Sequence, residues 1–328
     1  MTRDAAGPDL PAEFAFIARH FRPLAGPGSL DLSDDAAVLA PPGGVELVLA
    51  ADAMVEGVHF LPDDPPDTVG RKLLRTNLSD LAAMGADPLA YLMTTAVPPA
   101  RRDWLAGFAA GLGEDGRAFG IHVLGGDTVS TPGPVTLSLT ILGTVPPGAG
   151  LRRSGARAGD ELWVSGTIGD GALGLAVLTG RVAADADGHL ARRYRVPEPR
   201  LALGAALRGV ARAAMDVSDG LAGDLAKMLG LERMTARVRI ADVPLSRPVR
   251  RALALDPSLI RTVLTGGDDY EILCAVPPDT VPAFLADARA AGVPVTAIGA
   301  VARGDEAPAF VGPDGGEQRF EGGSFAHF

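Results

Sequence analysis

The aspartates of this chain recur in one sequence context, and they are the side chains best suited to chemistry. Most of them follow an apolar, strand-like run or occur in a turn rich in Gly, Ser or Ala, and one is predicted on a helix. They are Asp34, Asp35, Asp52, Asp80, Asp127, Asp216, Asp219, Asp268 and Asp269. Each alone is an ordinary turn or cap residue. Because strand ends gather at one edge of a sheet, these carboxylates are expected to converge, and converging carboxylates repel one another unless cations lie between them.

The type of ligand indicates which cation this would be. Oxygen ligands without a Cys or His cluster favour Mg²⁺ over zinc. Mg²⁺ held by few carboxylates keeps bound water and bridges to phosphates, which makes metal-assisted phosphoryl transfer the natural chemistry. The residues therefore predict an Mg²⁺-dependent, phosphate-handling enzyme. The alternative that they leave open is an α/β protein whose turns are acidic.

Asp80 is the one member of this set that is predicted on a helix. The spacing of Leu74, Leu78 and Leu81 predicts an amphipathic helix over residues 68–85, and Pro88 prevents its continuation. Burying a carboxylate without a partner is costly, so a metal ion is one candidate partner for Asp80. The alternative is that Asp80 faces water.

Helical and strand patterns alternate along the chain, and its length of 328 residues predicts two domains. Helices are expected at 12–21, 68–85, 101–119, 172–178, 201–211 and 221–229. Strands are expected at 45–51, 89–97, 121–124, 135–143 and 161–164, and in the run that ends at Cys274. The sequence PPGAG at 146–150 is a linker by composition, which places the domains at 1–148 and 149–328.

Composition excludes several classes of protein. The formal net charge of −10 argues against nucleic-acid binding, and two lysines, Lys72 and Lys227, leave no phosphate-binding loop of the GxxxxGK[ST] type. No apolar run reaches 18 residues and no basic-then-apolar leader is present, so neither a membrane span nor a secretory signal is expected. A single cysteine, Cys274, rules out an intrachain disulfide framework. These features together predict a cytoplasmic protein.

Seven motifs, in order and at matching spacing, resemble one known family. They are SDDAA at 33–37, Asp52 with VEGVHF at 55–60, NLSDLAAMGA at 77–86, GGDT at 125–128, RSG at 153–155, DVSDGL at 216–221 and GGDDYE at 266–271. The chain resembles the thiamine-monophosphate kinases, whose superfamily includes aminoimidazole ribonucleotide synthetase and selenophosphate synthetase. The resemblance extends from about Glu13 to Phe328.

The resemblance implies a function: ATP-dependent phosphorylation of thiamine monophosphate to thiamine diphosphate by in-line transfer, assisted by several Mg²⁺ ions. It also implies a fold, with an N-terminal mixed sheet and helices that bind ATP and Mg²⁺ and form a homodimer, and a C-terminal α+β domain that completes the active site. The implied metal ligands are Asp35, Asp52, Asp80, Asp127, Asp216 and Asp219, with Asp80, Asp127 and Asp216 at the catalytic centre. The implied ATP contacts are Gly126, Asp127, Arg153 and Ser218, and the implied contacts to thiamine monophosphate are His59, Asp268 and Phe325.

The chain departs from the family pattern at four places. Ala50-Ala51 replace a Ser-Thr pair, Ser33 replaces Gly, Asp268 replaces Glu, and Phe325 replaces Tyr. Selenophosphate synthetase would need a reactive Cys or selenocysteine and a Lys near the N-terminus, and this sequence has neither. The hydrogenase-maturation relatives would need a C-terminal Cys, but this sequence ends in His327-Phe328. The VEGVHF motif and the tail disfavour aminoimidazole ribonucleotide synthetase. A non-catalytic nucleotide-binding protein is the remaining alternative, supported by Ala50-Ala51.

Overall fold

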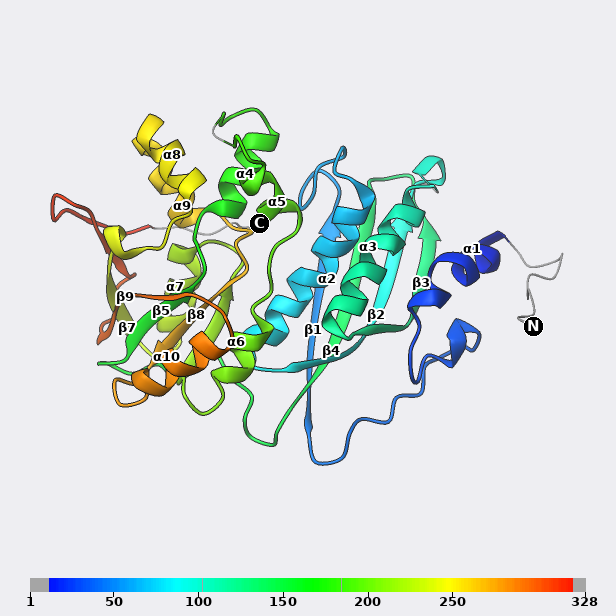
Figure 1. Cartoon of the computed structure of the whole chain (residues 1–328), viewed down its shortest axis with the longest axis horizontal. Coiled ribbons are helices and arrows are strands. Elements are labelled where there is room, and N and C mark those ends of the chain that lie inside the picture. The colour runs from blue at the N-terminus through cyan, green and yellow to red at the C-terminus, as the bar shows by residue number, and fades with distance from the viewer. Residues whose placement is uncertain (1–11, 102, 184, 321–328) are drawn as a thin grey trace. The chain divides into compact units, whose positions relative to one another are not determined.

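The computed structural model describes residues 12–101, 103–183 and 185–320, and these form two compact units (Figure 1). The first unit contains the described residues up to Asn77 together with Pro88–Thr144. The second contains Leu78–Asp87 and the described residues from Val145 onward. Among the described residues, no helix combines the length and the apolar character that crossing a membrane requires.

The first unit is built on a sheet whose four described strands have the order β1-β4-β2-β3. Figure 1 shows helices α2 and α3 covering this sheet. The strands are β1 (Glu46–Val55), β2 (Asp87–Val97), β3 (His122–Ser130) and β4 (Thr136–Val145), and the helices are α1 (Ala12–His20), α2 (Pro66–Ala83) and α3 (Trp104–Phe119). Strands β2 and β3 run parallel. The last residues of α2, from Leu78, belong to the second unit.

Glycines and one buried carboxylate bring α2 and α3 into close contact. A Cβ at Gly70 would lie 2.3 Å from the carbonyl oxygen of Phe108, so the two backbones approach where side chains are absent. Asp115 on α3 is fully buried and accepts hydrogen bonds from Arg71 and Arg75 on α2. A buried charge of this kind is tolerated because it is paired.

Two predicted element boundaries in this unit are wrong. The motif GGDT at 125–128 was predicted as a turn that ends a strand, but β3 continues through it to Ser130. The reason is its pairing with β2, in which Gly126 lies opposite Met93 and Asp127 opposite Thr94. Likewise, Asp52 was predicted to follow a strand, but it lies inside β1. Local turn propensity is overridden here by the neighbouring strand.

The second unit contains a sheet of seven described strands in the order β11-β10-β7-β9-β5-β8-β6. Its neighbouring described strands are antiparallel, except that β10 and β7 are parallel. The strands are β5 (Glu161–Ser165), β6 (Ala213–Val217), β7 (Met234–Arg239), β8 (Glu271–Val276), β9 (Val295–Arg303), β10 (Ala309–Val311) and β11 (Glu317–Gln318). The helices are α4 (Asp170–Leu178), α5 (His189–Arg195), α6 (Leu201–Ala206), α7 (Leu221–Gly230), α8 (Arg247–Leu255), α9 (Ile260–Thr265) and α10 (Val281–Ala290).

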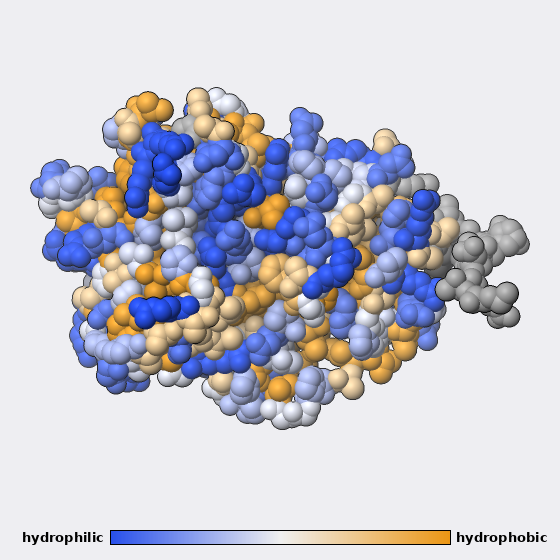
Figure 2. All heavy atoms as spheres, viewed as in Figure 1, coloured by the Kyte–Doolittle hydropathy of each residue, from blue (hydrophilic) through white to orange (hydrophobic). Residues whose placement is uncertain are grey.

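The α+β class predicted from the sequence is confirmed by these two sheets and their helices. Every residue of β6 and of β8 is buried, which explains why both read as continuous apolar runs with a single acidic interruption each. The helix predicted over 201–211 is too long, because α6 ends at Ala206 and Gly209 adopts a left-handed conformation. On the face shown in Figure 2, hydrophilic and hydrophobic residues are interspersed over the surface.

Candidate functional site

A cavity of about 620 Å³ in the first unit brings together residues from two of the acidic motifs. Asp34 and Asp35, from the loop before β1, line it together with Gly126 and Asp127 of β3. The remaining wall is mostly apolar and includes Phe21, Leu39, Leu92, Val123 and Leu142. The cavity therefore combines carboxylates with a surface that suits a planar, weakly polar group.

Gly126 is at a point where no side chain fits. A Cβ there would lie 1.7 Å from the carbonyl oxygen of Met93, its partner on β2. The neighbouring Asp127 accepts a hydrogen bond at Oδ1 from the backbone N–H of Thr128, 2.8 Å away, which orients its carboxylate. The missing side chain makes room for β2, and a ligand can reach the backbone here because Gly126 and Asp127 are both exposed in the described chain.

His59 is held by two contacts in the same unit. Its Nδ1 accepts a hydrogen bond from the backbone N–H of Val55 at 3.0 Å, and its carbonyl oxygen accepts one from Nζ of Lys72, also at 3.0 Å. Since Nδ1 is an acceptor, the ring proton is on Nε2 in the neutral form, which makes Nε2 a donor. Lys72 is only 2% exposed and was not singled out from the sequence, although the scarcity of lysine was a signal.

In the second unit, the end of α2 meets β6. The hydroxyl of Ser79 donates to Oδ2 of Asp216 at 2.8 Å, and both side chains are buried. Asp80 follows Ser79 in the chain and is half-buried. The sequence left Ser79 without a role, and nothing local in the helix pattern points to its partner 137 residues away.

The remaining predicted residues of the second unit lie in three places. The backbone N–H of Asp268 donates to the carbonyl oxygen of Ser218 at 2.9 Å, so these two motifs are adjacent. Asp219 forms an ion pair with Lys227. It does not cap helix α7, because the N-cap residue of that helix is Gly220. Arg153 is exposed in the loop before β5. Phe325 lies outside the described residues.

The predicted metal ligands divide between the two units. Among the residues that the structure describes, no three Asp, Glu, His or Cys side chains converge closely enough to hold a metal ion. The predicted ligands Asp35, Asp52 and Asp127 belong to the first unit, and Asp80, Asp216 and Asp219 belong to the second. Mg²⁺ is commonly held by one or two carboxylates with water and substrate phosphates, so donors of this type and number fit it.

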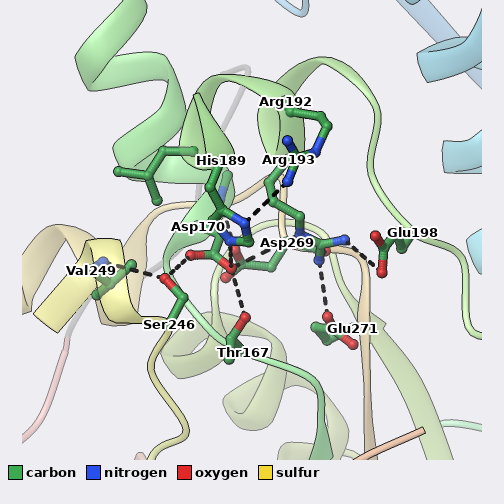
Figure 3. A network of polar contacts seen from close by, with 12 residues as sticks. Thr167, Asp170, His189, Arg192, Arg193, Glu198, Ser246, Val249, Asp269 and Glu271 are labelled. Carbon is green, nitrogen blue, oxygen red and sulfur yellow. Dashed lines mark hydrogen bonds and ion pairs between the residues drawn. The ribbon is translucent and has the colours of Figure 1, made fainter. Parts of the chain in front are cut away.

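A buried polar network surrounds the segment that carries Asp268 (Figure 3). Its carboxylates are Asp170, Asp269 and Glu271, each at most 1% exposed, and its bases include Arg193 and His189. Burial raises the pKa of Asp269 well above the ordinary carboxyl value, and neighbouring Asp170 raises it further; the N–H groups of Gly169 and Gly171 and the charge of Arg193 oppose the rise.

Cys274 is not a candidate nucleophile. It is buried in β8, and burial raises the pKa of its thiol to about 12. A thiol with such a pKa stays protonated at neutral pH and is unreactive. Cys274 is therefore a small core residue of the second unit.

Each half of the chain matches a known protein domain. Residues 33–145 match the N-terminal domain of AIR synthase related proteins, and residues 157–311 match their C-terminal domain. The fold, with its two units, is therefore that of an AIR synthase related protein.

More similar proteins identify the family within this class. The thiamine-monophosphate kinase of Caulobacter vibrioides is 48% identical over 318 residues, which cover 94% of this chain and 89% of that protein. The crystal structure of thiamine-monophosphate kinase from Stenotrophomonas maltophilia K279a is 37% identical, with a TM-score of 0.82 and coverage of 93% and 97%. A structure of AaThiL complexed with AMPPCP and TMP is 27% identical, with a TM-score of 0.77 and coverage of 90% and 91%. The chain belongs to the thiamine-monophosphate kinase family.

Proposed function

We propose that this chain phosphorylates thiamine monophosphate with ATP, giving thiamine diphosphate and ADP. The observation that carries the proposal is 48% identity over 94% of the chain to a thiamine-monophosphate kinase. The complex of the AaThiL relative with AMPPCP and TMP supports the same pair of substrates. We place the reaction in the cytoplasm, as composition predicts.

ATP is proposed to bind through Gly126, Asp127, Arg153 and Ser218. The cavity lined by Asp35, Gly126 and Asp127 supports this assignment, because its apolar wall suits a base and the exposed backbone at Gly126 and Asp127 is accessible to phosphates. Arg153 is exposed, and its guanidinium has the geometry to bind phosphate oxygens in pairs. With two lysines in the chain, arginine and metal ions must supply most of the positive charge.

Several Mg²⁺ ions are proposed to be held by Asp35, Asp52, Asp80, Asp127, Asp216 and Asp219. When bound, Mg²⁺ supplies charge neutralisation for the phosphates and keeps the attacking and leaving oxygens in line. Asp80, Asp127 and Asp216 are the residues that we assign to the catalytic centre. Ser79 orients the Asp216 carboxylate by its 2.8 Å hydrogen bond.

The acceptor is a phosphate monoester, and this simplifies the chemistry required of the protein. Its second pKa of about 6 leaves it largely ionised at neutral pH, so no general base has to remove a proton. The residues proposed to bind thiamine monophosphate are His59, Asp268 and Phe325. His59 would act as a hydrogen-bond donor through Nε2, since its Nδ1 is already an acceptor.

We assign residues 1–148 to ATP and Mg²⁺ binding and to dimerisation, and residues 149–328 to completing the active site. A homodimer through the N-terminal sheet is supported by the edge strand β1, on which Leu47 is 42% and Leu49 62% exposed. Apolar side chains at alternate positions of an edge strand are costly to leave in water.

The test is incubation with ATP, Mg²⁺ and thiamine monophosphate, followed by chromatography for thiamine diphosphate. We expect thiamine diphosphate and ADP in equal amounts, and no product when EDTA removes the metal. Unphosphorylated thiamine is the matched control substrate and should not be consumed. Folded protein that binds ATP with Mg²⁺ but forms no thiamine diphosphate would contradict the proposal and favour the non-catalytic nucleotide-binding alternative.

A further inference from the structure

The segment from Asp268 to Tyr270 has an unusual backbone. Asp268 has a φ of 69° and Tyr270 a φ of 53°, so two residues with side chains adopt the left-handed conformation on either side of Asp269. Left-handed residues other than glycine cost energy, and they persist only where the surrounding structure holds them. Such strain is concentrated at functional sites.

Asp269 is the anchor of this segment. Its carboxylate accepts hydrogen bonds from the backbone N–H groups of Gly169, at 2.7 Å, and Gly171, at 3.0 Å, at the start of helix α4. The side chain is 1% exposed. Breaking these bonds would leave buried polar groups without partners, so Asp269 resists any rotation of the segment.

Arg193 and Glu271 hold the segment on its other side (Figure 3). Arg193 donates from Nη2 to the carbonyl oxygen of Asp269 at 3.1 Å and to Oε1 of Glu271 at 2.9 Å. Glu271 is fully buried and also accepts hydrogen bonds from Arg200 and from the hydroxyl of Ser165. The backbone is therefore fixed both before and after Tyr270.

The neighbouring backbone leaves no room for this segment to shift. A Cβ at Gly171 would lie 2.2 Å from the carbonyl oxygen of Asp268, and a Cβ at Gly267 would lie 2.2 Å from that of Ser218. The N–H of Tyr270 also donates to the carbonyl oxygen of Val217 at 2.8 Å. Direct backbone contact of this kind holds the residues on either side of Asp269 in place.

Asp268 and Tyr270 have a different environment from Asp269. Both are half-buried, and the hydroxyl of Tyr270 lies 3.3 Å from Oδ1 of Asp268. We infer that Asp269 is a positioning residue for the substrate: its buried carboxylate, through the left-handed backbone on either side, sets the direction in which Asp268 and Tyr270 present their side chains to thiamine monophosphate. The inference rests on the proposed function, which assigns Asp268 to this substrate.

The test compares four proteins: wild type, Asp269→Asn, Asp268→Asn and the double variant. Asp269→Asn keeps the shape of the side chain but places an amide NH₂ against a backbone N–H. We expect the KM for thiamine monophosphate to rise about tenfold, while the KM for ATP changes by less than about twofold. Because Asp269 acts through Asp268 and Tyr270, the loss of affinity for thiamine monophosphate in the double variant should be smaller than the sum of the losses in the two single variants.

Asp160→Asn is the matched control, since Asp160 is also a buried carboxylate of the second unit that accepts a backbone N–H, from Arg157 at 2.8 Å. It should leave the KM for thiamine monophosphate unchanged. Equal rises in both KM values in Asp269→Asn, or additive effects in the double variant, would overturn the inference. If Asp269→Asn does not fold, Gly171→Ala tests the same point, because its Cβ would displace the carbonyl of Asp268.

A crystal structure of Asp269→Asn separates this inference from the proposed function. We expect residues 268 and 270 to leave the left-handed region in that variant, whichever substrate the protein uses. Retention of both conformations would overturn the positioning role. Failure of the wild type to bind thiamine monophosphate in calorimetry would instead overturn the proposed function and the identity of the substrate.

Discussion

The hydroxyl of Ser79 lies 2.8 Å from Oδ2 of Asp216 and joins the last turn of α2 to strand β6 inside the second unit. Ser79 is fully buried and Asp216 is 8% exposed. The contact gives the helix that carries Asp80 a defined position relative to a second predicted metal ligand. Through this hydrogen bond, Ser79 orients the carboxylate of Asp216.

Ser79→Ala should weaken both the fold and the response to Mg²⁺. Loss of the hydrogen bond to a buried carboxylate is expected to cost about 1–3 kcal/mol of unfolding free energy. Partners of metal ligands typically affect metal affinity by about tenfold or more, so the half-saturating Mg²⁺ concentration should rise by that factor. Rates measured against free Mg²⁺ check this.

Ser258→Ala is the control for that experiment, because Ser258 also donates to a carboxylate, Asp256 at 2.6 Å, but is exposed. Its Mg²⁺ dependence should match that of the wild type. An unchanged Mg²⁺ dependence in Ser79→Ala would mean that Asp216 does not bind Mg²⁺ or that Ser79 does not orient its carboxylate.

Asp80→Asn should lower turnover by about a hundredfold or more, because removal of one charged group at a phosphoryl-transfer centre removes stabilisation of the transition state. The thermal unfolding midpoint should stay close to that of the wild type, since Asp80 is only half-buried. Asp67→Asn, an exposed residue in the first turn of the same helix, should retain turnover. Near-normal turnover in Asp80→Asn would exclude Asp80 from the metal ligands.

Two adjacent glycines should respond differently to alanine. Gly126→Ala places a Cβ 1.7 Å from the carbonyl oxygen of Met93 and should destabilise the fold by about 1–3 kcal/mol, as overpacking does. At Gly125 the nearest atom, Cδ2 of Leu92, would be 3.5 Å away, so Gly125→Ala should be tolerated. Thermal unfolding of the two variants measures the difference. Equal stability would mean that β2 and β3 are not paired as described.

The buried carboxyl of Asp269 should make stability depend on pH in a definite direction. Its folded-state pKa is raised, so above the ordinary carboxyl pKa of about 4 the folded chain keeps a proton that the unfolded chain releases. The contribution of this group to stability is therefore fully present at lower pH and is lost as pH rises. Asp170, Arg193 and Glu271 are the charged groups around it.

Urea unfolding of wild type and Asp269→Asn across pH 4–8 measures this effect. The variant has no titratable group at this position, so the stability of the wild type relative to the variant should decrease as pH rises. A difference that is constant, or that grows with pH, would mean that Asp269 is ionised in the folded protein.

Much of the fold was predictable because its signals are local. The apolar stripe of Leu74, Leu78 and Leu81 predicted a helix over 68–85, and α2 spans Pro66–Ala83. The boundaries that were predicted wrongly in the first unit are set by distant neighbours. Strand β3 continues past Gly125 because β2 lies beside it, and no local pattern contains that pairing.

The sequence by itself determined the kinds of residue available for chemistry: aspartates in six of the seven motifs, two lysines and one cysteine. These limits follow from composition and order, and they already indicated Mg²⁺ and phosphate. Only the tertiary structure decided which side chains meet, such as Ser79 with Asp216 and Asp269 with the start of α4. Those contacts join residues about a hundred or more positions apart, and they depend on how buried surfaces pack rather than on any periodicity along the chain.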